Sequence, residues 1–310
     1  MTKIKNQMNI PLAFDYKFKK VFGDNDGIER LEAFIAQYFN IAYKEVHGNI
    51  TILNGEKRKN SKKEKGGSTD VYLKLELQSG NTRIDLEVSD IKLSQSIIDR
   101  DVLYGASNLS TQLQKNQKYS TLEPMIVICF DKGFLGKNTS IIDNYMLRNK
   151  KGNELTDKLQ IHHINIEKCY SVWYNKTINK YSKQEQNIIR LGALLCITNN
   201  EEFTKCLEEI FMEEEIKKNI EKANFALNDD EEINMWWYDA EIDRKLKKEA
   251  MLHDEIEYEK KKAREKGRKE GIKQTKEELV KNMLNKGISI SDISEITGLS
   301  KEEIEKLREE

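Results

Sequence analysis

The sequence predicts an α/β protein in which helices flank a mixed β-sheet. Three observations support this fold class. Residues 68–90 alternate apolar and polar side chains around a tight turn, which is typical of two antiparallel strands. Residues 125–130 form a short apolar run rich in β-branched side chains, as expected of a fully buried strand. Helical periodicity recurs before, between and after these segments, and strands that alternate with helices build layered α/β domains.

The first elements are expected to be helices. Apolar side chains recur at helical spacing over residues 14–22 and again over residues 31–38, and Gly23 and Gly27 separate the two segments. Residues 54–69 are polar and aperiodic and contain two adjacent glycines, so they predict a loop before the two strands.

The elements after the hairpin alternate in type. Residues 94–113 carry apolar side chains at helical spacing, which predicts a helix packed on the sheet. Residues 159–166 predict one more strand after the buried strand at 125–130, and helices follow from about Lys183 onward.

Composition and charge restrict the function classes. The chain has 310 residues, 34% of them charged and 38% hydrophobic, so it is long enough to bury a core. Its formal net charge is −1, and any site for a polyanion must therefore be local. The longest apolar run is too short to cross a bilayer, so no membrane association is expected. Widely spaced cysteines favour reduced, buried thiols in a cytoplasmic protein: Cys129, Cys169, Cys196 and Cys206.

The composition changes near Asp239, where large apolar residues become rare and mixed charge becomes dense. This pattern predicts a long exposed helix held partly by i,i+4 charge pairs. We therefore expect one domain over residues 1–238 and a charged helical extension over residues 239–310. Small residues recur every fourth position in the extension, and they either let a helix of a second chain approach or mark a solvated helix: Ala263, Gly267, Gly271 and Thr275.

Residues 287–310 have the pattern of two short helices around a turn. Gly298 suits the left-handed position that ends the first helix, and Ser300 with Glu303 can form a capping box on the second. The second helix carries more acids than bases, whereas contacts to DNA phosphates require bases. A role in packing or assembly is therefore favoured over DNA reading, and a homo-oligomer through the C-terminal helices is expected.

The pairing of the hairpin strands decides which polar side chains meet. A two-residue loop at residues 79–80 would pair Glu76 with Arg83, and Lys74 with Asp85. Both pairs join opposite charges, whereas a shift by two residues would set Glu76 against Asp85. With the first register these four side chains neutralise one another near the tip of the hairpin, which indicates a structural role.

Asp70 and Glu87 are left without basic partners in this register and are diagonal neighbours on one face. Two carboxylates completed by water and a substrate phosphate form a normal Mg²⁺ site. Two solvated acids on an exposed sheet face are the simpler alternative.

Several short motifs occur in a specific order along most of the chain. They are "FDYKFKKVFG", "STDVYL", "IDLEVS", "DRDVLYGASNLSTQL", "KYSTLEPMIVICF" and the C-terminal "AREKGRKEG" and "LNKGISISDISEITGLSKEEI". Together they resemble the recombination-promoting nuclease family, also called PD-(D/E)XK nuclease family transposases. The resemblance implies a PD-(D/E)XK, restriction-endonuclease-like sheet core. It also implies a DNA endonuclease that depends on Mg²⁺ or Mn²⁺.

The resemblance also implies roles for individual residues. Asp70 and Glu87 match the metal ligands, and Asp15 best matches a helper acid of the first helix. Lys19 belongs to the N-terminal signature, beside Phe18. Arg100 and Tyr104 match an Arg and a Tyr that the family carries on the helix after the sheet. Their spacing places them on one face of that helix, where they either contact phosphate or pack on the sheet.

The segment before Asp70 is rich in bases, and such a patch contacts DNA phosphates without reading sequence. A solvated lysine-rich loop is the alternative. The bases are Lys57, Arg58, Lys59, Lys62, Lys63 and Lys65.

Ser89 departs from the family, which usually carries Gln two residues after the Glu, whereas wider PD-(D/E)XK enzymes carry Lys. A lysine can orient the attacking water and stabilise developing charge, but a serine hydroxyl is short and uncharged. Lys92, just beyond the strand, is the candidate to replace it in the catalytic set. The alternative function is a catalytically impaired relative that binds DNA or protein.

Adjacent His162 and His163 would point to opposite faces of a strand, so they are expected to be surface or packing residues.

Overall fold

The computed structural model describes residues 9–23, 25–53, 70–133 and 140–309. It divides into two compact units, Met1–Leu246 and Lys247–Glu310. The change in composition near Asp239 falls inside helix α10 (Glu231–Asn285), so no break in the helix accompanies it.

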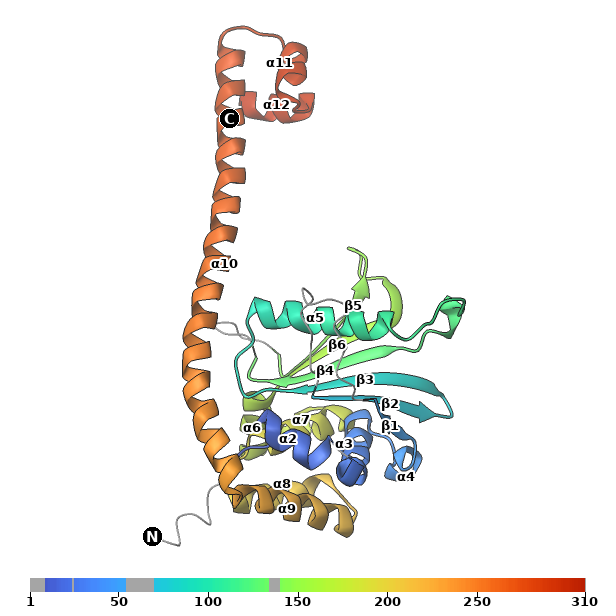
Figure 1. Cartoon of the computed structure of the whole chain (residues 1–310). Helices are drawn as coiled ribbons and strands as arrows, with labels where there is room; N and C mark the ends of the chain where they lie inside the picture. Colours follow the sequence, from blue (N-terminus) through green and yellow to red (C-terminus); the bar gives the residue numbers. More distant parts are fainter. Residues whose placement is uncertain (1–8, 24, 54–69, 134–139, 310) are drawn as a thin grey trace. The chain divides into compact units, whose positions relative to one another are not determined.

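The first unit contains a six-stranded mixed sheet in its described part, in the order β1-β2-β3-β4-β6-β5 (Figure 1). Strands β3, β4 and β6 are parallel, and the remaining pairs are antiparallel, which confirms the predicted fold class. Short β1 and largely exposed β5 were not predicted. The strands are β1 (Ile50–Ile52), β2 (Val71–Leu77), β3 (Gly80–Val88), β4 (Met125–Asp131), β5 (Ile142–Arg148) and β6 (Glu154–Asn165).

Helices cover both faces of this sheet (Figure 1). The helices predicted near residues 14–22, 31–38 and 94–113 are confirmed as α2, α3 and α5, and α7 begins at Lys183. Among the described helices, α5 (Gln95–Ser110) covers one face. The other face carries α2 (Asp15–Phe22), α3 (Ile28–Phe39), α6 (Ile166–Tyr174) and α7 (Lys183–Cys196), with α8 (Asn200–Ile210) and α9 (Glu214–Asn228) beyond them, and α4 (Tyr43–Val46) lies beside β2.

The main core lies between the sheet and α2, α3, α6 and α7. Aromatic rings link α2 to the sheet, since Phe18 packs on Phe34 with 6.1 Å between ring centroids and Phe34 packs on Phe130 of β4 at 5.7 Å. These rings are fully buried, and edge-to-face packing of this kind favours one orientation of each ring. The aromatic contacts therefore fix α2 against the central strands.

Helix α5 approaches the opposite face closely. A Cβ atom built on Gly105 would lie 2.8 Å from Val127 Cγ2 and 3.0 Å from Leu159 Cδ1, so only glycine fits without a shift of its neighbours. One turn further along α5, the Asn108 side chain donates a 2.7 Å hydrogen bond to Asp85 of β3. The polar face of the hairpin is therefore covered and partly buried.

The register predicted for β2 and β3 is wrong by two residues. The turn falls at residues 78–79, so Lys74 pairs with Arg83, and not with Asp85, while Glu76 pairs with Asn81, and not with Arg83. A shift of two residues keeps every side chain on its face. The apolar side chains of the alternating pattern in residues 68–90 therefore share the core face, where the following are buried: Val71, Leu73, Leu75, Ile84, Leu86 and Val88.

Glu123 explains why two bases can stand opposite each other. Its carboxylate accepts a 2.8 Å hydrogen bond from Arg83 Nε and a 2.9 Å bond from the Asn81 side chain, and it lies 3.2 Å from Lys74 Nζ. Glu123 directly precedes the segment that enters β4, so the charge that selects the register comes from outside the hairpin. The predicted mutual neutralisation within the hairpin tip is wrong for Asp85, which faces α5.

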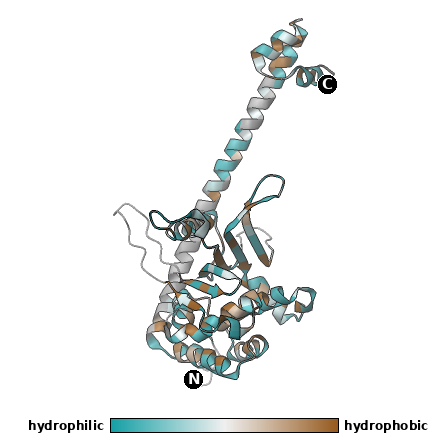
Figure 2. Ribbon diagram, turned by 90° about the vertical axis from the view of Figure 1, so that its right-hand side faces the viewer, coloured by the Kyte–Doolittle hydropathy of each residue, from teal (hydrophilic) through white to brown (hydrophobic). Residues whose placement is uncertain are grey.

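The second unit has a small core of its own. The end of α10 packs with α11 (Ile290–Thr297) and α12 (Lys301–Glu309) around buried Val280, Ile293 and Ile304. In Figure 2 hydrophobic residues gather in this helical hairpin, whereas the described stretches of α10 before it are mainly hydrophilic.

Local hydrogen bonds in the second unit match the predicted capping. Gly298 has φ +70° at the end of α11, and the Ser300 and Glu303 side chains bond to each other's backbone N–H groups. A Cβ built on Gly267 or Gly271 meets no described atom within 4 Å. The homo-oligomer expected through these helices stays a prediction. Within the described residues, no helix is both long and apolar enough to span a membrane.

We expect Glu123→Gln to lower the free energy of unfolding by about 1–2 kcal/mol at pH 7, because it removes the charge that Lys74 and Arg83 share. Partial burial alone would raise the pKa of Glu123, but hydrogen bonds from Arg83, Asn81 and Lys74 hold it below the ordinary 4.5. A carboxyl with a depressed pKa stabilises the fold above its unfolded-state pKa, and this contribution is lost as the pH falls through the folded value. The difference in the free energy of unfolding between the unmodified protein and Glu123→Gln, measured by urea titration, should therefore shrink below pH 4.5. Glu154→Gln, at an exposed ion pair with Arg148, is the matched control with little expected effect.

Gly105→Ala should destabilise the protein by about 1–2 kcal/mol, because the added methyl group pushes α5 away from the sheet. Gly267→Ala is the matched helical control and should be neutral or stabilise by up to about 1 kcal/mol, since nothing described lies near it. Thermal and urea unfolding followed by circular dichroism measure both. Equal effects of the two substitutions would contradict the close approach of α5.

Candidate metal and nucleic-acid site

Asp70 and Glu87 stand directly opposite each other. Val71 pairs with Leu86, and the same register carried one residue back sets Asp70 across from Glu87. The Asp70 N–H donates a 3.3 Å hydrogen bond to Glu87 Oε1, and the Val88 N–H donates a 2.9 Å bond to Asp70 Oδ2. The two acids are therefore closer than the diagonal neighbours predicted from the sequence, and backbone hydrogen bonds orient both.

Both carboxyl groups are buried, with 6% of Asp70 and 7% of Glu87 exposed, so the alternative of two solvated acids is wrong. Burial, and then the neighbouring charges of Asp70 and Asp85, raise the pKa of Glu87 far above its ordinary value. Burial, and then Asp15, likewise raise the pKa of Asp70. Two buried acids that resist ionisation side by side favour either a shared proton or a bound cation.

Helix α2 brings one base and one further acid to this pair. Lys19 Nζ lies 3.0 Å from Asp70 Oδ1 and 2.6 Å from Asp15 Oδ1, one helical turn earlier. Lys19 follows the buried Phe18, so the aromatic packing that fixes α2 also holds the ammonium group near Asp70. Asp15 is half-exposed and reaches Asp70 through this lysine.

Helix α5 brings Arg100 and Tyr104 to the other side of the pair. Arg100 Nη2 lies 4.0 Å from Glu87 Oε2, and its guanidinium carbon lies 5.7 Å from the centre of the Tyr104 ring. The Arg100 side chain is 41% exposed, so it borders the buried acids and also faces solvent. A guanidinium group in this position can reach a phosphate of a bound polyanion.

Ser89 and Lys92 differ in their relation to the pair. Ser89 and Glu87 line one small pocket beneath α5, but the Ser89 hydroxyl also accepts a 3.4 Å hydrogen bond from the Ile91 N–H. The Lys92 ammonium bonds to the Lys132 carbonyl and to Glu167. The structure therefore holds Lys92 by other partners, and the base it brings to Asp70 is Lys19.

The basic segment lies outside the described residues. Its candidate DNA contacts stay predictions: Lys57, Arg58, Lys59, Lys62, Lys63 and Lys65.

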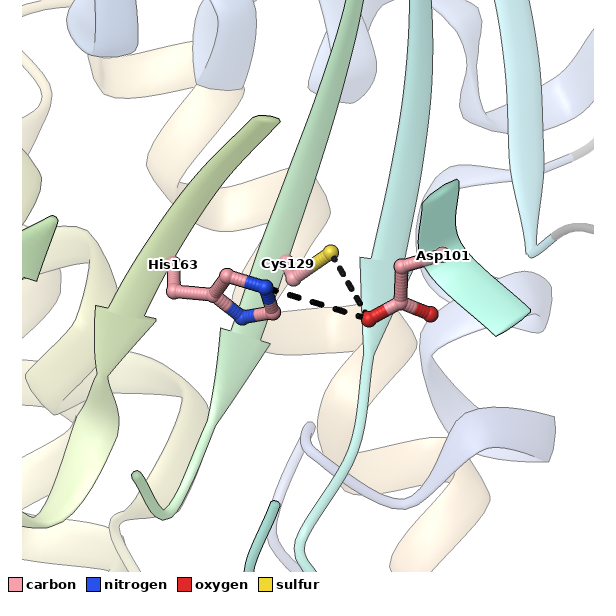
Figure 3. A group of neighbouring side chains, drawn as sticks. All are labelled: Asp101, Cys129 and His163. Carbon is pink, nitrogen blue, oxygen red and sulfur yellow. Dashed lines mark hydrogen bonds and ion pairs between the residues drawn. The ribbon is translucent and has the colours of Figure 1, made fainter. Parts of the chain in front are cut away.

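A second polar group adjoins Glu87 and was not predicted as a site. Asp101 of α5, Cys129 of β4 and His163 of β6 lie together on the sheet face that α5 covers (Figure 3). Glu87 pairs with Cys129, and Cys129 with His163, so one row crosses three parallel strands. The alternation of side chains along a strand assigns each residue to one face of the sheet. Only the register between strands that are distant in sequence brings Glu87, Cys129 and His163 into one row.

His162 and His163 point to opposite faces of β6, as predicted. His162 lies 2.8 Å from the Tyr38 hydroxyl on the α3 side, while His163 lies 2.8 Å from Asp131 on the α5 side. Burial lowers the pKa of His162 to about 4, so its ring is neutral at pH 7. The prediction of a packing residue suits His162, but His163 belongs to a buried polar cluster.

The mixed sheet, with an acid pair on adjacent strands and flanking helices, defines an α/β protein of the PD-(D/E)XK class. A model of the family described as "PD-(D/E)XK nuclease family transposase" matches residues 12–255, and the chain belongs to this family. A second model, described as "Rpn/YhgA-like nuclease family, C-terminal HTH domain", matches residues 281–309, which include α11 and α12. No curated protein and no solved structure matches the chain.

Proposed function

We propose that this protein is a metal-dependent DNA endonuclease that hydrolyses phosphodiester bonds, of the recombination-promoting nuclease type. The observation that carries the proposal is the buried pair of Asp70 and Glu87 within a chain that matches the nuclease family over residues 12–255. Burying two neighbouring carboxyl groups destabilises a fold unless positive charge or protons compensate them. Lys19, 3.0 Å from Asp70, and Arg100, 4.0 Å from the other acid, supply part of this compensation, and a bound cation would supply the rest.

The donor set suits a hard divalent cation such as Mg²⁺ or Mn²⁺. Asp70 and Glu87 would supply two carboxylate ligands, with Asp15 as a helper acid, and Mg²⁺ commonly combines one or two carboxylates with water and substrate phosphate. Such an ion, when bound, polarises the scissile phosphate and lowers the pKa of a water molecule.

The surrounding side chains have roles of their own in this proposal. Arg100 would contact a DNA phosphate while its other contacts hold it near Glu87, and Tyr104 would support the guanidinium plane. Lys19 would supply the positive charge that Ser89 lacks, because its ammonium already lies 3.0 Å from Asp70. The backbone N–H of Val88 holds Asp70 in the orientation that faces Glu87.

DNA is the proposed partner, and two further parts of the chain support this choice. The C-terminal helices match the HTH domain of related nucleases, although α12 is acidic. In this proposal the basic residues among 57–65, predicted from the sequence as DNA contacts, would bind phosphates. Assembly of two chains through the C-terminal helices belongs to the same proposal.

Asp70→Asn and Glu87→Gln should each reduce cutting of supercoiled plasmid by roughly 100-fold or more, because each removes a ligand charge at nearly constant shape. The assay compares Mg²⁺, Mn²⁺ and EDTA, and EDTA should abolish cutting by the unmodified protein. Asp99→Asn is the matched control, since Asp99 is an exposed acid on α5 that bonds to Gln95.

The impaired-relative alternative gives a different result in the same experiment. Plasmid that stays intact with either metal, together with gel-shift binding that ignores the metal, would assign the chain to DNA binding without cleavage. Circular dichroism of each variant separates a lost site from a lost fold.

Ser89→Gln should raise plasmid cutting by on the order of 100-fold if position 89 limits the unmodified enzyme, because a longer amide can orient the attacking water. Lys19→Met should abolish the residual activity in the Ser89 protein. An unchanged rate for Ser89→Gln, with a large loss for Lys19→Met, would show that Lys19 alone supplies the missing function.

A further inference from the structure

The group of Asp101, Cys129 and His163 has the composition and geometry of a metal site distinct from the acid pair. All three side chains are buried, with 1% to 9% exposed. Asp101 Oδ2 lies 3.6 Å from Cys129 Sγ and 4.0 Å from His163 Nε2, as Figure 3 shows. One atom from each of three elements therefore faces a common point.

The Asp101 carboxylate divides its two oxygens between different partners. Oδ1 accepts hydrogen bonds from Arg100 Nε at 3.1 Å and Nη2 at 3.0 Å. Oδ2 is the atom turned toward Cys129 and His163. Arg100 thereby orients the carboxylate so that a single oxygen points into the cluster.

The His163 ring is oriented in the same manner. Nδ1 lies 2.8 Å from Asp131 Oδ2, and the other Asp131 oxygen accepts a 2.6 Å hydrogen bond from the Gly133 N–H. A neutral ring that donates its Nδ1 proton to Asp131 presents the Nε2 lone pair to Asp101 and Cys129. A carboxylate behind a histidine is the usual support of a metal-bound imidazole.

The distances come close to those of a tetrahedral zinc centre. Bond lengths of about 2.3 Å to sulfur and 2.0–2.1 Å to nitrogen and oxygen place the ligand atoms ~3.3–3.5 Å apart. The observed 3.6 Å and 4.0 Å from Asp101 need contractions of well under 1 Å, and all three ligand atoms lie within 4.8 Å of one another. A thiolate and an imidazole favour Zn²⁺ over Mg²⁺, which prefers oxygen ligands.

We propose that Asp101, Cys129 and His163 bind one zinc ion, with Asp131 as the supporting carboxylate of His163. The three ligands come from α5, β4 and β6, so the ion would fasten α5 to the sheet at the end where Arg100 meets Glu87. Asp101, Cys129 and Asp131 line the small pocket that Glu87 and Ser89 also line, and in this proposal a water in that pocket would be the fourth ligand. This proposal does not depend on nuclease activity.

Titration of the full-length, metal-free protein with Co²⁺ tests the proposal directly. We expect one equivalent to produce tetrahedral visible bands and an intense near-ultraviolet thiolate-to-cobalt band, both removed by one equivalent of Zn²⁺. Cys129→Ser should lose the thiolate band. Cys206→Ser, which changes another buried free thiol, is the matched control and should retain it.

A second variant tests the geometry without removing a ligand. Asp131→Asn presents an amide N–H to His163 Nδ1. The ring proton then moves to Nε2, so the Nε2 lone pair is no longer free to bind the metal. Zinc affinity measured by competition with a chromogenic chelator should fall about 10- to 100-fold, the usual effect of losing such a carboxylate. Asp70→Asn should leave the cobalt spectrum unchanged, which separates this site from the acid pair.

Two results would overturn the proposal. The absence of a thiolate band in the unmodified protein would show that the cluster is a metal-free hydrogen-bonded network. A band that persists in Cys129→Ser would place the metal on another cysteine.

Discussion

The strand register across the sheet is the constraint on which the whole polar centre depends. The antiparallel pairing of β2 with β3 sets Asp70 against Glu87, and the parallel pairing of β3, β4 and β6 continues the row through Cys129 to His163. A slip of one residue in any of these strands would turn its member of the row into the opposite, apolar core. Backbone hydrogen bonds between the strands therefore determine which side chains meet in this row.

Helix α5 converts this row into a buried polar layer. Its close approach at Gly105 brings the helix against the sheet face. Arg100 lies beside Glu87, and Asp101 turns one oxygen toward Cys129. Arg100 contacts both the acid pair and the Asp101 cluster, since it lies 4.0 Å from Glu87 and bonds to Asp101. Any movement of α5 would therefore alter the acid pair and the Asp101 cluster together.

Local patterns predicted the faces of the strands but not their alignment. The alternation of apolar and polar residues was enough to assign Asp70 and Glu87 to one face of the sheet, because this pattern can be read within each strand without knowing its partner. The register depended on Glu123, which lies 40 residues from Arg83 in sequence and compensates two bases that would otherwise repel. His163 and Cys129 were missed for a similar reason: their proximity to Asp101 exists only after three elements have assembled. The capping motifs of α11 and α12 were predictable because they involve residues within one turn.

Ligand chemistry gives a physical reason why the two proposed cation sites would prefer different ions. Asp70 and Glu87 offer only carboxylate oxygens, and Lys19 next to them raises the cost of binding any cation that lacks the compensation of a substrate phosphate. The Asp101 cluster would offer a thiolate and an imidazole in a small pocket, and the base beside it in the described residues, Arg100, bonds to the Asp101 oxygen that points away from Cys129. A soft site of this kind retains its ion without substrate, whereas the oxygen site is filled best when a polyanion is present. If both proposals hold, the same sheet row would combine a structural ion with one that binds together with the substrate.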